Sequence, residues 1–178
     1  MSGYHWVFRF LCHQIPSRSP EYLGETFPVC FRCAGLYGGL CISYLFAVFQ
    51  ARLWQRFPAR ELAWPLATLT FPLQLDAWGN ALGLWQSPAL LRACTGMAAG
   101  IAIPFLLLPL VRLADSRPLP VRNVRSLIGP LCAGTVFVAM LVRPVSRIAF
   151  EWLSYVCVLG LISLLVNVCF AWRERMYG

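Results

Sequence analysis

The stretch AGLYGGLCISYLFAVFQ, residues 34–50, lies between Arg32 and Arg52 and contains no charged side chain. A second stretch of this kind, ACTGMAAGIAIPFLLLPLV at residues 93–111, lies between Arg92 and Arg112. An α-helix of about 20 apolar residues is long enough to cross the hydrocarbon core of a bilayer. Each stretch therefore predicts one membrane-spanning helix.

The composition of the whole chain agrees with a membrane protein. Of its 178 residues, 59% are apolar and only 12% are charged, and the mean hydropathy is +0.65. A soluble domain normally contains about 25% charged and about 45–50% apolar residues. The composition excludes most soluble folds and predicts an all-α integral membrane protein.

Three further apolar runs between charged residues bring the predicted bundle to five transmembrane helices. We expect the spans near residues 34–51, 62–85, 90–111, 125–142 and 149–171. Residues 1–33 are too polar to span, and we expect them to form a Cys/His-containing segment at the membrane interface. Residues 34–178 then form the transmembrane bundle.

The basic residues predict an orientation, because all fifteen are arginines that flank the expected spans. Five spans place nine arginines on the face of the C-terminus, at positions 52, 56, 60, 112, 117, 122, 125, 173 and 175, and six on the other face, at positions 9, 18, 32, 92, 143 and 147. The positive-inside rule then favours an outside N-terminus and a cytoplasmic C-terminus in a multi-pass protein of the cell (inner) membrane, which we expect to be bacterial. Nucleic acid is not an expected partner, since the arginines do not gather on one soluble face.

Two cysteine motifs in the N-terminal segment indicate a metal site. They are Cys12-His13 and the CxxC motif from Cys30 to Cys33. Two thiolates at this spacing can bind one zinc ion from a single turn, and a Cys or His pair elsewhere completes the site. Adjacent residues rarely point the same way, so a three-ligand site with an open position is an alternative to four ligands.

Two other readings of these thiols remain open. Cys30 and Cys33 could form a redox-active disulfide with Cys12 as the resolving thiol, or all three could simply be buried. The remaining cysteines lie within predicted spans, where a free cysteine usually packs as a small apolar residue.

Asp76 is the acidic residue expected inside a span. A carboxylate at that depth is costly unless it is paired or hydrated, so intramembrane acids are candidates for function. Asn80 shares its helix face, and Arg92 is the expected ion-pair partner. Together with Arg18 these residues predict a polar pocket whose catalytic candidates are Asp76, Arg92 and Arg18. A purely structural Asp–Arg pair that joins two helices is the alternative.

Small residues predict which helices pack closely. Gly35 and Gly39 lie on one stripe of the first expected helix, and Gly96 and Gly100 lie on one stripe of the third. This spacing lets helix backbones touch.

These motifs in combination resemble an uncharacterised family of small prokaryotic membrane proteins, domain of unknown function 2085. The resemblance rests on CHQIPSRS at residues 12–19, FPVCFRCAGLYGG at 27–39, an aspartate in the second span and LLRACTGMAAG at 90–100, and it covers about residues 10–105. It implies that the motif residues are Cys12, His13, Pro16, Arg18, Ser19, Cys30, Arg32, Cys33, Gly35, Tyr37, Gly39, Asp76, Arg92, Thr95 and Gly96. It implies no activity.

The sequence therefore predicts a membrane protein with a zinc site that faces a polar cavity. An accessory subunit of a larger membrane complex and a membrane thiol–disulfide oxidoreductase are the alternatives. Expected partners are the lipid bilayer, other membrane subunits, or a lipid-like or anionic small molecule.

Overall fold

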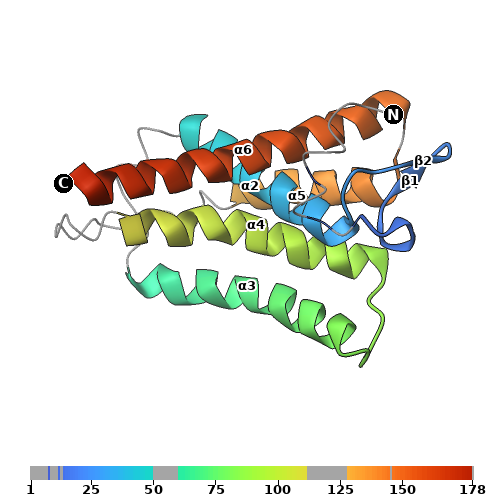
Figure 1. Cartoon of the computed structure of the whole chain (residues 1–178), viewed down its shortest axis with the longest axis horizontal. Helices are drawn as coiled ribbons and strands as arrows, with labels where there is room; N and C mark the ends of the chain where they lie inside the picture. The colour runs from blue at the N-terminus through green and yellow to red at the C-terminus, as the bar shows by residue number, and fades with distance from the viewer. Residues whose placement is uncertain are drawn as a thin grey trace.

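The computed structural model describes Phe8, Cys12 and residues 14–49, 60–111, 128–144 and 146–177. This part of the chain is mostly helical and contains five α-helices and one small hairpin (Figure 1). In chain order the elements are η1 (Pro16–Arg18), β1 (Glu21–Tyr22), β2 (Glu25–Thr26), α2 (Phe31–Phe49), α3 (Arg60–Ala81), α4 (Ala89–Val111), α5 (Ile128–Val142) and α6 (Arg147–Tyr177). The five predicted helices are confirmed in number and order.

The helix ends follow the local chemistry of the chain. Helix α3 stops at Ala81 instead of near residue 85, because Gly83 takes a positive φ of 71° that breaks the helix. Helix α4 begins just after Pro88, a residue that suits the start of a helix. Helix α6 continues to Tyr177, beyond the predicted range.

One helix of the described residues is long and apolar enough by itself to cross a membrane. It is the part of α6 from Arg147 to Val166, with 20 residues and a mean hydropathy of 2.0. The apolar stretches found within α2, α4 and α5 are shorter, at Phe31–Phe46, Ala89–Pro104 and Ile128–Val142. The structure thus shows the helices, while their number as membrane spans stays a prediction.

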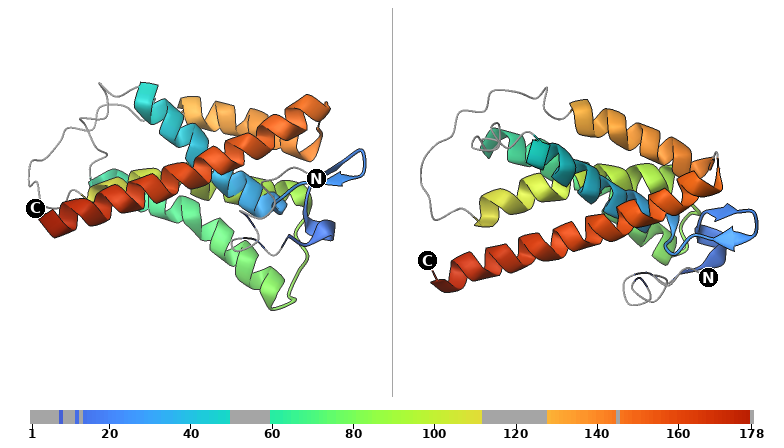
Figure 2. Two further views of the ribbon diagram at one scale, coloured as in Figure 1. Left: turned by 45° about the horizontal axis from the view of Figure 1, so that its top comes forward. Right: turned by 90° about the horizontal axis from the view of Figure 1, so that it is seen from above.

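Helix α2 lies at the centre of the bundle and contacts α4, α5 and α6, whereas α3 packs mainly against α4 on the outside (Figures 1 and 2). The α2–α4 contact is made backbone to backbone. A Cβ atom added to Gly96 would collide with the carbonyl oxygen of Arg32, and one added to Gly39 would lie 2.7 Å from the carbonyl oxygen of Met97. The predicted glycine contact between these helices is confirmed.

The N-terminal segment contains a hairpin that the sequence did not predict. Strands β1 and β2 pair antiparallel through a turn at Leu23 and Gly24, which both have positive φ values, of 52° and 80°. Two positive φ angles are typical of a type I′ hairpin turn. Phe27 follows the hairpin and packs edge-on against Phe150 of α6, with ring centroids 5.1 Å apart. The hairpin therefore holds the N-terminal segment against α6 just before Cys30.

Candidate metal centre and polar network

Three cysteines that are distant in sequence come together at the start of α2. The Sγ atoms of Cys12, Cys30 and Cys33 all lie within 4.8 Å of one another. Cys30 immediately precedes α2 and Cys33 lies in its first turn, so both thiols project from the same side of the helix. The backbone N–H of Cys30 donates to Cys12 Sγ at 3.3 Å. The expected grouping of these three thiols is thus present.

The three sulfur atoms fit a zinc ion. With a Zn–S bond of about 2.3 Å, two sulfurs on a tetrahedral ion lie about 3.8 Å apart. The thiols therefore need to approach each other by at most about 1 Å, since they already lie within 4.8 Å. His13, the fourth expected ligand, lies outside the described residues.

The hydrogen bonds among the thiols favour one thiolate. The pKa of Cys12 is well below its usual range, because the Cys30 thiol, and after it the Cys33 thiol, donates to its sulfur. The pKa of Cys30 is raised, chiefly by that same hydrogen bond to Cys12. All three are free thiols. The cluster thus offers three sulfur atoms, one of them readily ionised, and thiolate sulfur is a donor that zinc prefers.

The other five cysteines do not join the cluster. All lie on helices, Cys41 and Cys157 buried and Cys94, Cys132 and Cys169 exposed. Cys41 and Cys157 agree with the prediction that these cysteines pack as small buried residues, whereas the exposed Cys94, Cys132 and Cys169 do not.

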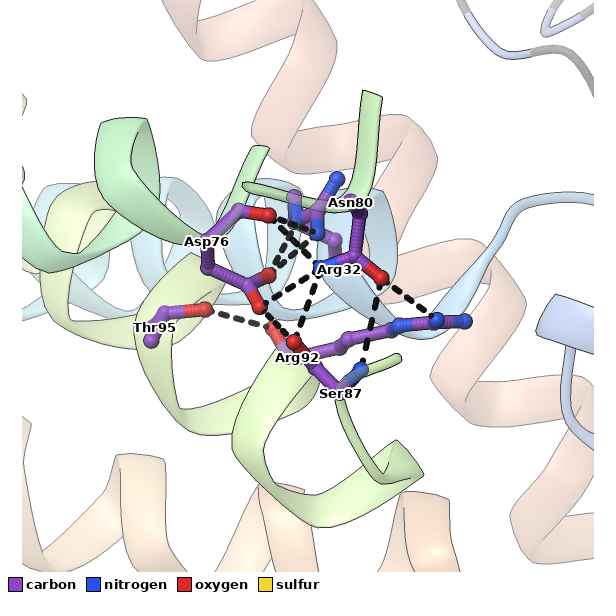
Figure 3. A network of polar contacts seen from close by, with 6 residues as sticks. All are labelled: Arg32, Asp76, Asn80, Ser87, Arg92 and Thr95. Atoms are coloured by element: carbon purple, nitrogen blue, oxygen red, sulfur yellow. Dashed lines mark hydrogen bonds and ion pairs between the residues drawn. The ribbon is translucent and has the colours of Figure 1, made fainter. Parts of the chain in front are cut away.

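Asp76 is buried, with 4% of its side chain exposed, and its partner is Arg32. Arg32 Nε donates to Asp76 Oδ2 at 2.8 Å, and Arg32 Nη2 reaches both Oδ2 and the backbone oxygen of Asp76, the latter at 3.2 Å (Figure 3). The predicted Asp76–Arg92 ion pair is therefore wrong. Arg32, in the first turn of α2, binds the carboxylate even though α3 packs mainly against α4, the helix that carries Arg92.

The second oxygen of Asp76 is also occupied. Asn80 Nδ2 donates to Asp76 Oδ1 at 3.0 Å, and Ser87 Oγ donates to the same atom (Figure 3). Asn80 was expected on this helix face, whereas Ser87 was missed because it lies in the loop after α3, where sequence gives no periodic signal. Both oxygens are thus satisfied without Arg92.

Arg92, in the first turn of α4, binds Asn80 instead. Its Nη2 donates to Asn80 Oδ1 at 2.9 Å (Figure 3). The Arg92 side chain is 9% exposed, and its buried Nε has no hydrogen-bond partner among the described residues.

Arg18 lies at the end of η1 and is exposed. Arg32, which binds Asp76, lies between Cys30 and Cys33 in the chain. The candidate polar residues and the cysteine cluster are therefore neighbours at one end of the bundle, as predicted from topology.

A sequence model of the family described as "Predicted membrane protein (DUF2085)" matches residues 12–106. That range covers more than half of the chain and includes the cysteine cluster and the polar network. The chain belongs to the DUF2085 family. The DUF2085 description places it in a lipid bilayer environment.

The curated relatives of this DUF2085 protein are archaeal. An uncharacterized protein of Methanocaldococcus jannaschii is 32% identical over 105 residues, which are 58% of this chain and 65% of the relative. An uncharacterized protein of Methanothermobacter thermautotrophicus is 33% identical over 99 residues, which are 56% of this chain and 86% of the relative. The expected bacterial source is thus not supported. No solved structure matches the chain.

Proposed function

We propose that this DUF2085 protein is an integral membrane zinc protein in which Cys12, Cys30 and Cys33 bind one ion at the membrane interface. The observation that carries the proposal is the position of the three Sγ atoms, all within 4.8 Å of one another. Thiols that were merely buried would not need to converge from an N-terminal segment and a helix start. The fourth position is open to His13 or to an exchangeable ligand.

The membrane part of the proposal is a multi-pass bundle. Large apolar side chains are exposed along its outer helices, among them Trp64, Phe71 and Trp78 of α3 and Trp152 and Leu165 of α6. Soluble monomers rarely expose apolar surface of this extent. Helices α2 and α4, with 19 and 23 residues, fall in the range of about 17–25 residues that span a bilayer.

The arrangement of the bundle supports a membrane orientation. The hairpin and the starts of α2, α4 and α6 lie at one end, and the C-terminus of α6 lies at the other (Figure 1). The metal site and the polar network thus share one membrane face. From the arginine distribution we propose that this face is outside and that the C-terminus is cytoplasmic.

The residues of the polar pocket divide into two roles. Asp76 accepts hydrogen bonds from Arg32, Asn80 and Ser87, so we propose it as a positioning residue that holds the first turn of α2 against α3. Arg92 and Arg18 keep free positive charge beside the metal site, and we propose that they contact an anionic ligand. Bound zinc would act there as a Lewis acid toward such a ligand or as a structural ion.

Elemental analysis of the purified protein tests the proposal. We expect close to one zinc per chain in the wild type and almost none in Cys30→Ser. Cys94→Ser is the matched control, because Cys94 is exposed on α4 and lies outside the cluster. Metal-free wild type with a trapped Cys30–Cys33 disulfide would instead support thiol–disulfide exchange and refute the zinc site.

A further inference from the structure

Arg92 carries a buried hydrogen-bond donor that nothing in the described residues satisfies. Its side chain is 9% exposed, and its Nε has no partner among these residues. Buried donors without acceptors are rare in native proteins, and each one calls for an explanation such as an unseen ion or ligand. The missing partner must be an acceptor.

Arg92 also forms no ion pair among the described residues. In the described part of the chain, the ion pairs at this end of the bundle are Arg32–Asp76, Arg147–Glu25 and Arg147–Glu151. Arg92 belongs to none of them. An anionic acceptor would satisfy both the Nε–H group and the charge.

A groove between α3 and α4 begins at Ala99, seven residues beyond Arg92 along α4. Its volume is about 280 Å³, and it is lined by Thr70, Leu73 and Gln74 of α3 and by Ala99, Ile103 and Leu106 of α4. Most of the lining is apolar. A chain of methylene groups therefore suits the groove better than a polar solute does.

The groove and the unsatisfied donor share one helix face. Arg92, Thr95, Ala99, Ile103 and Leu106 follow one another at intervals of three or four residues, which places them on one stripe of α4. From Arg92 to Leu106 the helix rises about 21 Å, more than the depth of about 15 Å of one bilayer leaflet. The stripe thus has a cationic end at the membrane interface and an apolar path into the bilayer.

We propose that α3 and α4 bind an anionic phospholipid, whose phosphate accepts from Arg92 Nε and whose acyl chain lies in the α3–α4 groove. Arg18, which is exposed at the same end of the bundle, adds a second positive charge. The site depends on the membrane location of the protein but not on zinc, so the two proposals can fail separately.

Thermal unfolding of delipidated protein in detergent tests the head-group half of the site. Phosphatidylglycerol should raise the melting temperature of the wild type, whereas phosphatidylcholine and inorganic phosphate should not. Arg92→Gln should weaken the apparent affinity for phosphatidylglycerol at least tenfold. Arg143→Gln, which removes an exposed arginine at the same end of the bundle, should retain it. Arg18→Gln should weaken binding several-fold, and because this residue is exposed the variant tests the site even if Arg92→Gln does not fold.

A pair of substitutions on α3 tests the groove. Leu73→Trp fills the groove and should weaken phosphatidylglycerol binding several-fold. Leu75→Trp makes the same change at a side chain that is 48% exposed and is not part of the lining, and it should bind like the wild type. Equal shifts from both lipids, an equal shift from inorganic phosphate, or wild-type binding by Arg92→Gln or Leu73→Trp would overturn the proposal. Zinc content should be unchanged in all these variants.

Discussion

Arg32 Nε donates to Asp76 Oδ2 at 2.8 Å and joins the first turn of α2 to α3 across 44 positions of sequence. Arg32 lies between the two cysteines of the CxxC motif, so one helical turn carries both the thiols and the buried ion pair. The same turn also contacts α4, whose Gly96 meets the carbonyl oxygen of Arg32. The polar network therefore fixes the position of the candidate metal site.

Loss of the ion pair should destabilise the protein. Arg32→Met leaves a buried carboxylate without its cation, and we expect a loss of about 2–4 kcal/mol. This is somewhat less than for a fully buried pair, because Arg32 is 22% exposed. The loss is measured as the difference in the free energy of unfolding between the variant and the wild type in the same detergent. Arg147→Met is the control, because the Arg147 side chain is 65% exposed in its two ion pairs and their loss should cost at most about 1 kcal/mol. Equal losses in the two variants would contradict the structural role of Asp76.

Close packing of α2 on α4 gives a second prediction. Gly96→Ala forces the two backbones apart, because the added Cβ collides with the Arg32 carbonyl oxygen, and overpacking of this kind costs about 1–3 kcal/mol. Gly134→Ala is the control, since its nearest neighbours are the Met97 Cγ and Sδ atoms at 3.1 Å, in a flexible side chain. It should cost less than about 1 kcal/mol. We expect Gly96→Ala to have a lower melting temperature than Gly134→Ala. A Gly96→Ala variant that is more stable than Gly134→Ala would refute the contact.

Removal of the metal should lower stability, because Cys12 and the bound ion tie the N-terminal segment to α2. A ligand at 100 times its dissociation constant stabilises the folded state by about 2.7 kcal/mol. A zinc chelator should therefore lower the melting temperature of the wild type and leave Cys12→Ser unchanged. Zinc affinity should also fall as the pH falls, since protons compete for the thiolates. A chelator effect of equal size in Cys12→Ser would show that the metal binds elsewhere.

The fold was largely predictable because apolar runs between arginines mark helices directly. The grouping of Cys12 with Cys30 and Cys33 was predictable too, since CxxC at a helix start exposes two thiols on one side and needs a third ligand from elsewhere. The glycine stripes at positions 35/39 and 96/100 correctly indicated close helix packing, and the structure shows that the two stripes face each other.

The partner of Asp76 was not predictable in the same way. Arg32 and Arg92 both lie in the first turn of a helix at the same end of the bundle, and topology alone cannot choose between them. Although α3 packs mainly against α4, Arg92 donates to Asn80, whereas Arg32 binds one carboxylate oxygen of Asp76 and Ser87 and Asn80 occupy the other. The β1–β2 hairpin was missed because Leu23, unlike Asn or Gly, gives no sign of its positive φ.

X-ray absorption at the zinc edge of the purified protein tests the central claim most directly. We predict about three sulfur neighbours at about 2.3 Å and one lighter atom, with the sulfur signal reduced in Cys33→Ser and unchanged in Cys132→Ser. Zinc surrounded only by oxygen and nitrogen, or no stoichiometric zinc at all, would contradict the account.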